Sequence, residues 1–186
     1  MTIEIVDHRG SWPAEFATIA ARLREALGER ALRIDHIGST SVPGLAAKDV
    51  IDIQVTVAAL EDETLRPLLE AAGFRWLDDL RHDHLPPGLD LDPAELEKRM
   101  VVAGSGERRV NVHLRVEGRF NHRYALLFRD YLRAHPEAAA ALAEVKRALA
   151  EHFPEDADAY YAVKDPVNDV ILAAAREWAA ATDWTP

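Results

Sequence analysis

Residues 36–57 read HIGSTSVPGLAAKDVIDIQVTV, a polar turn followed by a regular alternation of side chains. The segment from Val50 to Val57 carries Ile or Val at each odd position, with Asp52, Gln54 and Thr56 between them. This period of two predicts a half-buried β-strand whose Ile and Val side chains lie in the core. The stretch therefore predicts a sheet protein in which a strand follows a turn rich in glycine and hydroxyl side chains.

The segments on either side of this stretch predict further helices and strands. Apolar residues recur at helical spacing from Phe16 to Leu27, after Ser11 and Pro13 and before Gly28, which predicts a capped amphipathic helix. The order of elements as a whole predicts an α/β or α+β chain with a mixed sheet. The remaining predicted elements are a strand (32–37), a helix (62–72), a strand (74–77), a long loop (78–93), a two-stranded hairpin (99–103 and 109–116) and helices over 122–134, 137–152, 157–164 and 166–182.

Length and composition are those of a globular protein. The chain has 186 residues, 48% of them hydrophobic and 29% charged, and no cysteine. Because a domain takes about 100–200 residues, we expect one domain over residues 1–186, with a core over 6–118 and a helical tail over 121–182. The lack of cysteine excludes disulfides, thiolate metal sites and cysteine nucleophiles. With no apolar run of membrane-spanning length and no signal-peptide core near the N-terminus, we expect a cytoplasmic protein without a membrane partner.

The distribution of charge is uneven. The chain carries 32 acidic and 22 basic residues, a net charge of −10, which argues against a nucleic-acid partner because such proteins present basic surfaces. Residues 98–133, however, hold nine basic and three acidic residues, so this segment carries +6 and the rest −16. Either the segment lines a cleft for a phosphorylated or carboxylate ligand, or its arginines lie on the solvated face of a strand and a helix.

The turn before the alternating strand has the composition of an anion site. Gly38 leaves room for a close backbone approach, and Ser39, Thr40 and Ser41 offer three hydroxyls beside backbone amides. Lys48 adds a positive charge nearby. The alternative is a polar turn capped by its own hydroxyl side chains.

Asp52 is the residue of the strand that most needs an explanation, since aspartate is disfavoured in the middle of a strand. A carboxylate next to a phosphate-binding turn is what a Mg²⁺–nucleotide site requires, because hard cations prefer oxygen ligands. We therefore predict Asp52 as a metal ligand and catalytic residue, with Mg²⁺ as the cofactor.

The string from His36 to Lys48, followed by Ile51-Asp52-Ile53, closely resembles the signature of the GrpB-like family, which belongs to the nucleotidyltransferase (polymerase-beta-like) superfamily. Residues 127–136, LFRDYLRAHP, resemble its second hallmark, and Lys146 and Lys164 resemble its later lysine positions. The resemblance covers nearly the whole chain. It implies an α+β fold, with a mixed β-sheet flanked by helices and a C-terminal helical portion.

The resemblance also implies a role for the turn and exposes a departure from the family pattern. In active superfamily members the Gly-Ser turn, here Gly38-Ser39, grips a nucleotide triphosphate beside an Asp-x-Asp or Asp-x-Glu strand and a third carboxylate. Here the second carboxylate position holds Gln54, and the later strand offers Asn111 and His113 rather than an acid. Two metals about 3.5–4 Å apart need several anionic oxygens, so a two-metal reaction is poorly supported by Asp52 alone.

Other acids and histidines offer weaker alternatives. Asp35 or Asp49 could supply a missing carboxylate, although Asp49 would need irregular backbone to reach the face of Asp52. The run Arg81-His82-Asp83-His84 is either a metal site or a set of surface histidines, because its spacing defines no third ligand.

Two hypotheses from different classes follow. In the first, the chain binds a nucleotide or phosphorylated small molecule and possesses Mg²⁺-dependent nucleotidyl or phosphoryl transfer centred on Asp52. The residues that would hold the ligand are Gly38, Ser39, Thr40, Ser41, Lys48, Arg109, His113 and Arg115. In the second, suggested by GrpB-like domains fused to dephospho-CoA kinase, the chain is a non-catalytic accessory or folding module with a protein partner. The chain has no kinase P-loop of its own.

Overall fold

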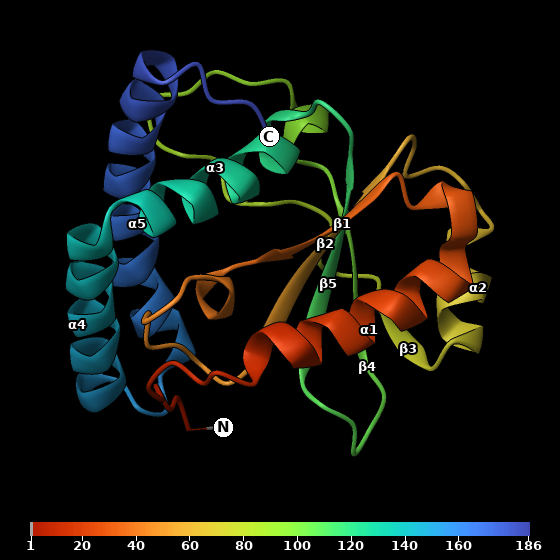
Figure 1. Cartoon of the computed structure of the whole chain (residues 1–186), viewed down its shortest axis with the longest axis horizontal. Coiled ribbons are helices and arrows are strands. Elements are labelled where there is room, and N and C mark those ends of the chain that lie inside the picture. Colours follow the sequence, from red (N-terminus) through yellow and green to blue (C-terminus); the bar gives the residue numbers. More distant parts are fainter. Residues whose placement is uncertain (1) are drawn as a thin grey trace.

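The computed structural model describes residues 2–186, and at its centre lies a five-stranded sheet in the order β1–β2–β5–β4–β3. The sheet is mixed: β2 runs antiparallel to β1 and parallel to β5, and β4 runs antiparallel to both β5 and β3. The predicted α+β fold with a C-terminal helical portion is confirmed (Figure 1). The strands are β1 (Arg33–Ile37), β2 (Ile51–Val57), β3 (Phe74–Leu77), β4 (Arg99–Ala103) and β5 (Val110–Val116), and the α-helices are α1 (Trp12–Leu27), α2 (Leu65–Ala71), α3 (Phe120–Ala134), α4 (Pro136–His152) and α5 (Ala157–Ala181).

The two faces of the sheet differ because side chains alternate along each strand. The apolar side chains of β2 and β5 pack with those of α1 and α2 in one buried cluster, which includes Leu23, Ile53, Leu69 and Val112. Helices α1 and α2 lie on one side of the sheet, and α3, α4 and α5 lie on the other (Figure 1). The side of the sheet covered by α1 and α2 is therefore a hydrophobic core. The polar face of the sheet points toward the C-terminal helices.

The polar face of β2 is more deeply buried than the sequence predicts. Gln54 is 0% and Thr56 is 1% exposed, so the prediction of a half-buried strand is wrong for these positions. The reason is that α3 covers this face: the Gln54 amide donates a hydrogen bond of 3.2 Å to the carbonyl oxygen of His122. Only Asp52, at the start of the strand, keeps a partly exposed side chain.

A second cluster joins the turn segment to the helical half. Val42, Leu45 and Ala46 follow the Gly-Ser turn and pack against Leu132 of α3 and Leu142 of α4. All five side chains are almost completely buried. The turn is thus fixed between the sheet on one side and the C-terminal helices on the other.

Some helices differ from the prediction in their bounds or capping, and α3 begins at Phe120 rather than at residue 122. Helix α5 continues through Pro166, where the sequence predicts two helices. Helix α2 begins at Leu65 rather than at residue 62, because Asp62 instead accepts hydrogen bonds from Thr64 in a turn. Ser11 precedes α1 as predicted, but its side chain makes no cap hydrogen bond to the helix backbone.

Residues 78–98 cross the polar side of the molecule as an extended segment, here called the strap. Two backbone hydrogen bonds close it on itself, from Asp83 to Leu96 and from Lys98 to Arg81. The predicted long loop 78–93 lies within it. Within residues 2–186, no helix is long and apolar enough to cross a bilayer.

Candidate functional site

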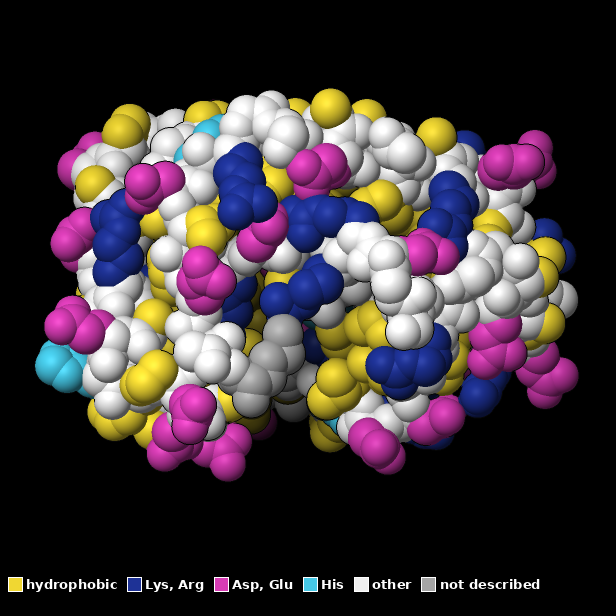
Figure 2. All heavy atoms as spheres, turned by 90° about the horizontal axis from the view of Figure 1, so that it is seen from below, with side chains coloured by type: hydrophobic (Ala, Val, Ile, Leu, Met, Phe, Trp, Pro, Cys, Tyr) yellow, Lys and Arg dark blue, Asp and Glu magenta, His cyan; other side chains and the backbone are white. Residues whose placement is uncertain are grey.

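The polar face of the sheet, the strap and helices α3 to α5 enclose a cavity of about 1170 Å³. It is lined by Gly38 and Ser39 of the turn, by Asp52 of β2, by His113 of β5 and by Lys146 of α4, among others. Lys and Arg side chains gather across the hollowed middle of the face seen from below (Figure 2). The first four of these residues were predicted from sequence as site residues, and the fold brings them together in one place.

Gly38 is required by both backbone conformation and space. Its φ of 67° lies in the left-handed region that side chains disfavour. A Cβ atom at this position would lie 2.6 Å from Oδ2 of Asp52, closer than real carbon–oxygen contacts allow. The turn therefore passes directly over the Asp52 carboxylate, at a distance that only glycine permits.

The hydroxyls of the turn have separate tasks. Thr40 is buried and its Oγ1 lies 3.0 Å from Nε2 of His36, while Ser41 donates a 2.6 Å hydrogen bond to the Gly38 carbonyl. Among the residues described, Ser39 is the hydroxyl of this turn whose side chain has no hydrogen-bond partner. It lines the cavity together with Thr40. Ser39 is therefore the hydroxyl best placed for a ligand, and Thr40 and Ser41 hold the turn in shape.

Two arginines of α3 fix the carbonyls of the same turn. Arg133 donates through Nε (3.1 Å) and Nη2 (2.8 Å) to the carbonyl oxygen of Ser41, and Arg129 donates to that of His36 at 3.2 Å. Both arginines belong to the LFRDYLRAHP hallmark, so this motif supports the turn from the helical side. Because these carbonyl oxygens are paired with arginines, a ligand would meet the backbone amides of the turn and the Ser39 hydroxyl.

Asp52 has neighbours that leave its carboxylate free to bind a cation. Asn111 donates to its Oδ1 at 2.9 Å, and Nε2 of His113 lies 3.9 Å from the same oxygen. The pairing of β2 with β5 sets this arrangement, because Asp52 lies opposite Asn111 and Gln54 opposite His113 in the parallel register. Burial lowers the pKa of His113, so its imidazole is neutral near pH 7 although Asp52 acts in the opposite direction.

Gln54, at the position where the resemblance led us to expect a second carboxylate, has both ends of its amide hydrogen-bonded within the fold. Its Oε1 accepts a 2.7 Å hydrogen bond from Arg115. Arg115 in turn makes a bidentate pair with Asp83 of the strap, at 2.8 and 3.0 Å, and Asp83 also pairs with Lys98 at 2.6 Å. Burial by itself would raise the pKa of Asp83, but the two cations and the Arg115 hydrogen bonds hold it well below its usual range. Arg115 therefore lines the cavity, but its charge is already balanced by Asp83.

Three lysines from different elements converge on the cavity. Lys48 precedes β2, Lys146 lies on α4, and Lys164 lies on α5. Nζ of Lys48 lies 4.3 and 4.5 Å from the ring centres of Tyr160 and Tyr161, close enough for cation–π contact. Lys164 is paired with Asp165 at 3.0 Å, whereas no acid pairs with Lys48 or Lys146 within residues 2–186, so this end of the cavity is suitable for an anionic ligand.

Lys146 is the most perturbed of the three. It is only 3% exposed, and its ammonium donates to the carbonyl oxygen of Ala46. Burial, together with the charges of Lys164 and Lys48, lowers the pKa of Lys146 to about 7, although Asp52 raises it. A buried ammonium surrounded by like charges gains most from an anionic ligand.

The remaining predicted residues fall at the edge of the cavity or outside it. Arg109 is exposed at the rim, and no acid pairs with it within residues 2–186. Asp49 binds Arg9, Arg108 and the indole of Trp12. Asp35 lies on the same face as Asp52 but is paired with Arg33 and Arg129.

The donor set determines which metal arrangement fits. In the part of the chain that the structure describes, no group of three or more His, Asp or Glu side chains could hold a metal ion. Mg²⁺ usually binds proteins through one or two carboxylates together with ligand phosphates and water. Asp52, whose side chain is 28% exposed and lies beneath Gly38, fits one Mg²⁺ that arrives with a phosphate, and the residues present do not fit a two-metal pair.

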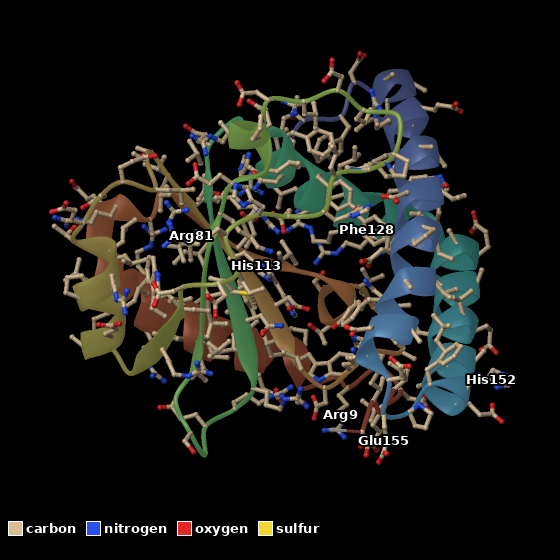
Figure 3. The ribbon with its side chains drawn as sticks, turned by 180° about the vertical axis from the view of Figure 1, so that it is seen from behind. Arg9, Arg81, His113, Phe128, His152 and Glu155 are labelled. Atoms are coloured by element: carbon tan, nitrogen blue, oxygen red, sulfur yellow. The ribbon has the colours of Figure 1, made fainter. Side chains whose placement is uncertain are left out.

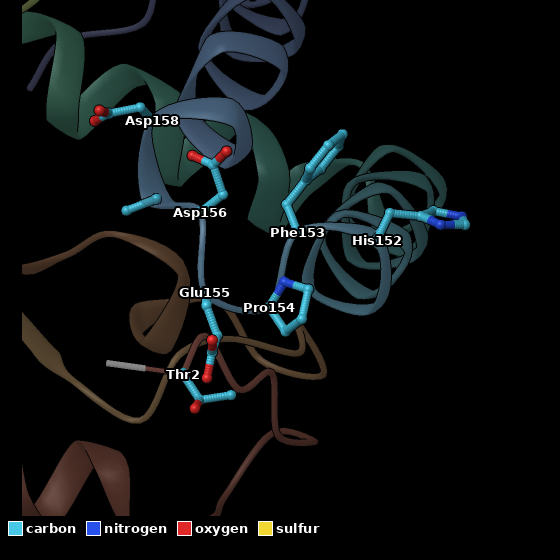
Figure 4. A pocket seen from close by; sticks show the side chains of 8 residues that line it. Thr2, His152, Phe153, Pro154, Glu155, Asp156 and Asp158 are labelled. Carbon is cyan, nitrogen blue, oxygen red and sulfur yellow. The ribbon is translucent and has the colours of Figure 1, made fainter.

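A second hollow lies at the turn between α4 and α5, near Thr2 (Figure 4). Its charged side chains, Glu155, Asp156 and Asp158, are acidic, and His152 points away from them. It lacks the converging cations of the larger cavity.

Sequence reasoning missed the part played by Asp83. It belongs to the run from Arg81 to His84, for which the sequence predicts either a metal site or a set of surface histidines. In the structure His82 is exposed, His84 pairs with Asp169 of α5 at 3.0 Å, and Asp83 is the acid that anchors the strap. The excess of basic residues over 98–133 was the available signal, because a buried cation needs an acidic partner from elsewhere.

Comparison with known proteins places the chain in a family. Residues 2–174 match the family described as GrpB protein. The chain is 41% identical to a dephospho-CoA kinase from Mycolicibacterium paratuberculosis, over 99% of this chain and 48% of that protein. It is 38% identical to a UPF0157 protein from Pseudomonas aeruginosa, over 93% of this chain and 67% of that protein. The chain thus spans about half the length of the kinase relatives it matches.

Solved structures agree on the fold. The crystal structure of GrpB from Enterococcus faecalis superposes with a TM-score of 0.78 at 30% identity, covering 94% of this chain and 99% of that one. A structure of the Cid1 poly(U) polymerase superposes with a TM-score of 0.50 at 14% identity, covering 80% of this chain and 44% of that one, which shows the nucleotidyltransferase-like fold alone. The chain belongs to the GrpB family.

Proposed function

We propose that the chain binds a nucleotide or other small molecule that carries a polyphosphate, with one Mg²⁺ held between Asp52 and the phosphate oxygens. The convergence of Lys48, Lys146 and Lys164 on the cavity that contains Asp52 carries this proposal. Of these three lysines only Lys164 is paired with an acid, Asp165, and an array of cations with fewer acids is suited to several linked phosphates. In this arrangement Ser39 and the lysines hold the phosphates, and Asp52 and Asn111 orient the metal.

Nucleotidyl or phosphoryl transfer would have to proceed with a single metal at this site. Asp52 is the catalytic residue of that reaction in our proposal, and His113 and Arg109 face the ligand. Polymerase-like in-line transfer between two metals is disfavoured, because Gln54 is bound to Arg115 and His122 and supplies no charge.

A second candidate function is a non-catalytic accessory module that acts with a protein partner. The specific observation in its favour is that Gln54, at the second carboxylate position, is built into the fold by two hydrogen bonds. The length of the kinase relatives, of which this chain spans about half, agrees with such a role. A nucleic-acid partner remains disfavoured by the net charge of −10.

Thermal unfolding in the presence of ligands tests the proposal. The panel contains tripolyphosphate, nucleoside triphosphates, sugar phosphates and coenzyme A precursors, each with and without Mg²⁺. A ligand at 100 times its Kd stabilises the folded state by about 2.7 kcal/mol, which raises Tm by several degrees. We expect such a shift with polyphosphates, larger with Mg²⁺ than without it.

Two variants make the result specific. Asp52→Asn should abolish the additional shift caused by Mg²⁺ and keep part of the metal-free shift, whereas Asp79→Asn, an exposed acid of the strap, should behave as the unmodified chain. If no polyphosphate shifts Tm, the accessory-module function is favoured and the binding proposal is wrong.

A further inference from the structure

An aromatic row on α3 lines the same cavity. Phe120, Tyr124 and Phe128 are spaced four residues apart and therefore share one face of the helix. The ring centres of Phe120 and Tyr124 lie 6.0 Å apart, as do those of Tyr124 and Phe128, and the latter pair is nearly parallel, at 12°. In the view from behind, Phe128 on α3 and His113 on β5 are labelled near the middle of the molecule (Figure 3), and both line the cavity.

Phosphate binding does not account for this row. All three rings belong to the lining of the cavity, and none is completely buried. Phosphates do not bind to hydrocarbon, so the rings add nothing to the lysine end of the site. Phe120 and Tyr124 pack in part against the cluster of Leu127 and Leu172, and Phe128 packs in part against the cluster of Leu132 and Leu142, so the rings lie between the core and the cavity. Aromatic rings that line a cavity beside a polyanion site are suited to a planar ring carried by the same ligand.

The surroundings of the row are polar and carry both signs of charge, because Asp165 is paired with Lys164 at 3.0 Å. Asp165 and Asn168 of α5 line the cavity here, and His84 reaches it from the strap. Burial raises the pKa of Tyr124 well above its usual range, and the negative charges of Asp169 and Asp165 raise it further against the opposing charge of Arg115. The amide of Asn168 both donates and accepts hydrogen bonds. The lysines therefore favour the phosphates of a ligand, whereas the rings and Asn168 favour a planar group with polar edges carried by the same ligand.

We propose that Tyr124 and Phe128 stack against the nucleobase of a nucleotide whose phosphates lie at the lysine end, with Asn168 at the edge of the base. The proposal rests on the proposed function and narrows it from phosphorylated small molecules in general to nucleotides. In this arrangement the base is held between α3 and α5, and the polyphosphate extends toward Ser39 and Asp52.

Isothermal titration calorimetry with paired probes tests this inference. The probes are Mg²⁺–tripolyphosphate, which lacks a base, and the Mg²⁺ complexes of ATP, GTP, CTP and UTP. At least one triphosphate should bind about tenfold more tightly than tripolyphosphate, given the usual strength of base–aromatic stacking. Tyr124→Leu and Phe128→Leu should each remove most of that advantage and leave the Kd of tripolyphosphate unchanged.

Two further variants separate stacking from loss of structure. Tyr124→Phe keeps the ring and should retain tight binding of the triphosphate. Tyr131→Leu removes a ring of the same size from α3. This ring packs against His135 and Trp178 and does not line the cavity, so triphosphates should still bind more tightly than tripolyphosphate. If Tyr124→Leu fails to fold, Phe128→Leu and the comparison of triphosphates with tripolyphosphate on the wild type still test the stacking.

The outcomes distinguish this inference from the proposed function. If tripolyphosphate binds and none of the four triphosphates binds more tightly, the base site is wrong and the polyphosphate site stands. The base site is also wrong if Tyr124→Leu and Phe128→Leu weaken both kinds of ligand equally. If neither kind of ligand binds, the proposed function fails and this inference fails with it.

Discussion

Lys146 is a buried lysine whose protonation depends on the charges of the neighbouring side chains and of a bound ligand. Its pKa of about 7 means that the empty site holds this lysine only partly protonated at neutral pH. Because ligand phosphates favour the protonated form, binding should take up a proton above pH 7. We therefore expect the affinity for Mg²⁺–tripolyphosphate to fall between pH 7 and 9, by up to about tenfold per pH unit.

Titration calorimetry across this pH range, in buffers of different ionisation enthalpy, measures both the slope and the proton uptake. Lys146→Met should bind more weakly at pH 7 and show a flatter profile, since the titrating group is gone. Equal slopes in the wild type and Lys146→Met would contradict this role for Lys146.

Gln54 stands where the family resemblance led us to expect a second carboxylate, and its environment explains why an amide fits there. The side chain is fully buried, and both ends of its amide are used, one by Arg115 and the other by His122. A carboxylate in its place would lack the proton needed to donate to the His122 carbonyl, and two acceptors would face one another. The position of Gln54 therefore favours an amide over a carboxylate, which agrees with our proposal of a site with Asp52 as its one carboxylate.

At the scale of elements, the strap depends on one acid. Asp83 accepts hydrogen bonds from Lys98, Arg115 and Asn121. Asp83→Asn would leave two buried cations without their counter-charge, and removing one partner of a buried pair costs about 3 kcal/mol or more. We expect the free energy of unfolding, measured with urea at pH 7, to fall by about that amount.

Asp79→Asn is the matched control, because Asp79 lies on the same strap with an exposed side chain. It should change the stability by less than about 0.5 kcal/mol, as surface substitutions usually do. A comparable loss in both variants would show that Asp83 has no special part in fixing the strap.

Helix α5 illustrates the competition between local preference and packing. Pro166 removes a backbone donor and favours two separate helices. The helix nonetheless continues, because Tyr160 before the proline and Leu172 and Ala175 after it are buried against the rest of the molecule. Packing of both halves of the helix outweighs the local break, and Lys164 and Asn168 are thereby placed one turn apart on the cavity.

At the scale of the whole molecule, the sheet and the C-terminal helices share a core. Leu142 of α4 is 2% exposed and packs with Val42, Leu45 and Ala46 of the turn segment. Leu142→Ala should lower the stability of the whole chain by about 2–4 kcal/mol, as removing a buried leucine usually does. Because this cluster joins the sheet to the C-terminal helices, we expect both parts to unfold in a single transition.

Far-UV circular dichroism reports mainly the helices, and tryptophan fluorescence reports among others Trp12, which is completely buried beside the sheet. The two signals should change at the same temperature in the wild type and in Leu142→Ala. Val170→Ala, at a position of α5 that is 73% exposed, is the control and should leave Tm nearly unchanged. Separate transitions for the two signals would mean that the halves unfold independently.

The sequence by itself determined the strands, most of the helices and the nature of the turn. Alternation from Val50 to Val57 and helical spacing from Phe16 to Leu27 are local patterns, and local patterns fix which face of each element is apolar. The same patterns placed Asp52, Asn111 and His113 on polar strand faces. The family resemblance added the α+β fold and the turn at Gly38-Ser39, which the structure places over Asp52.

Only the tertiary structure decided what covers the polar face and which charges remain free. Gln54 became buried, Arg115 was paired with Asp83, and Lys146 joined Lys48 across about a hundred residues of chain. These outcomes depend on the strand order and on the packing of α3 to α5, which bring together residues far apart in sequence. No periodicity within one segment encodes such long-range pairing, because the energy of a buried charge is set by neighbours from other elements.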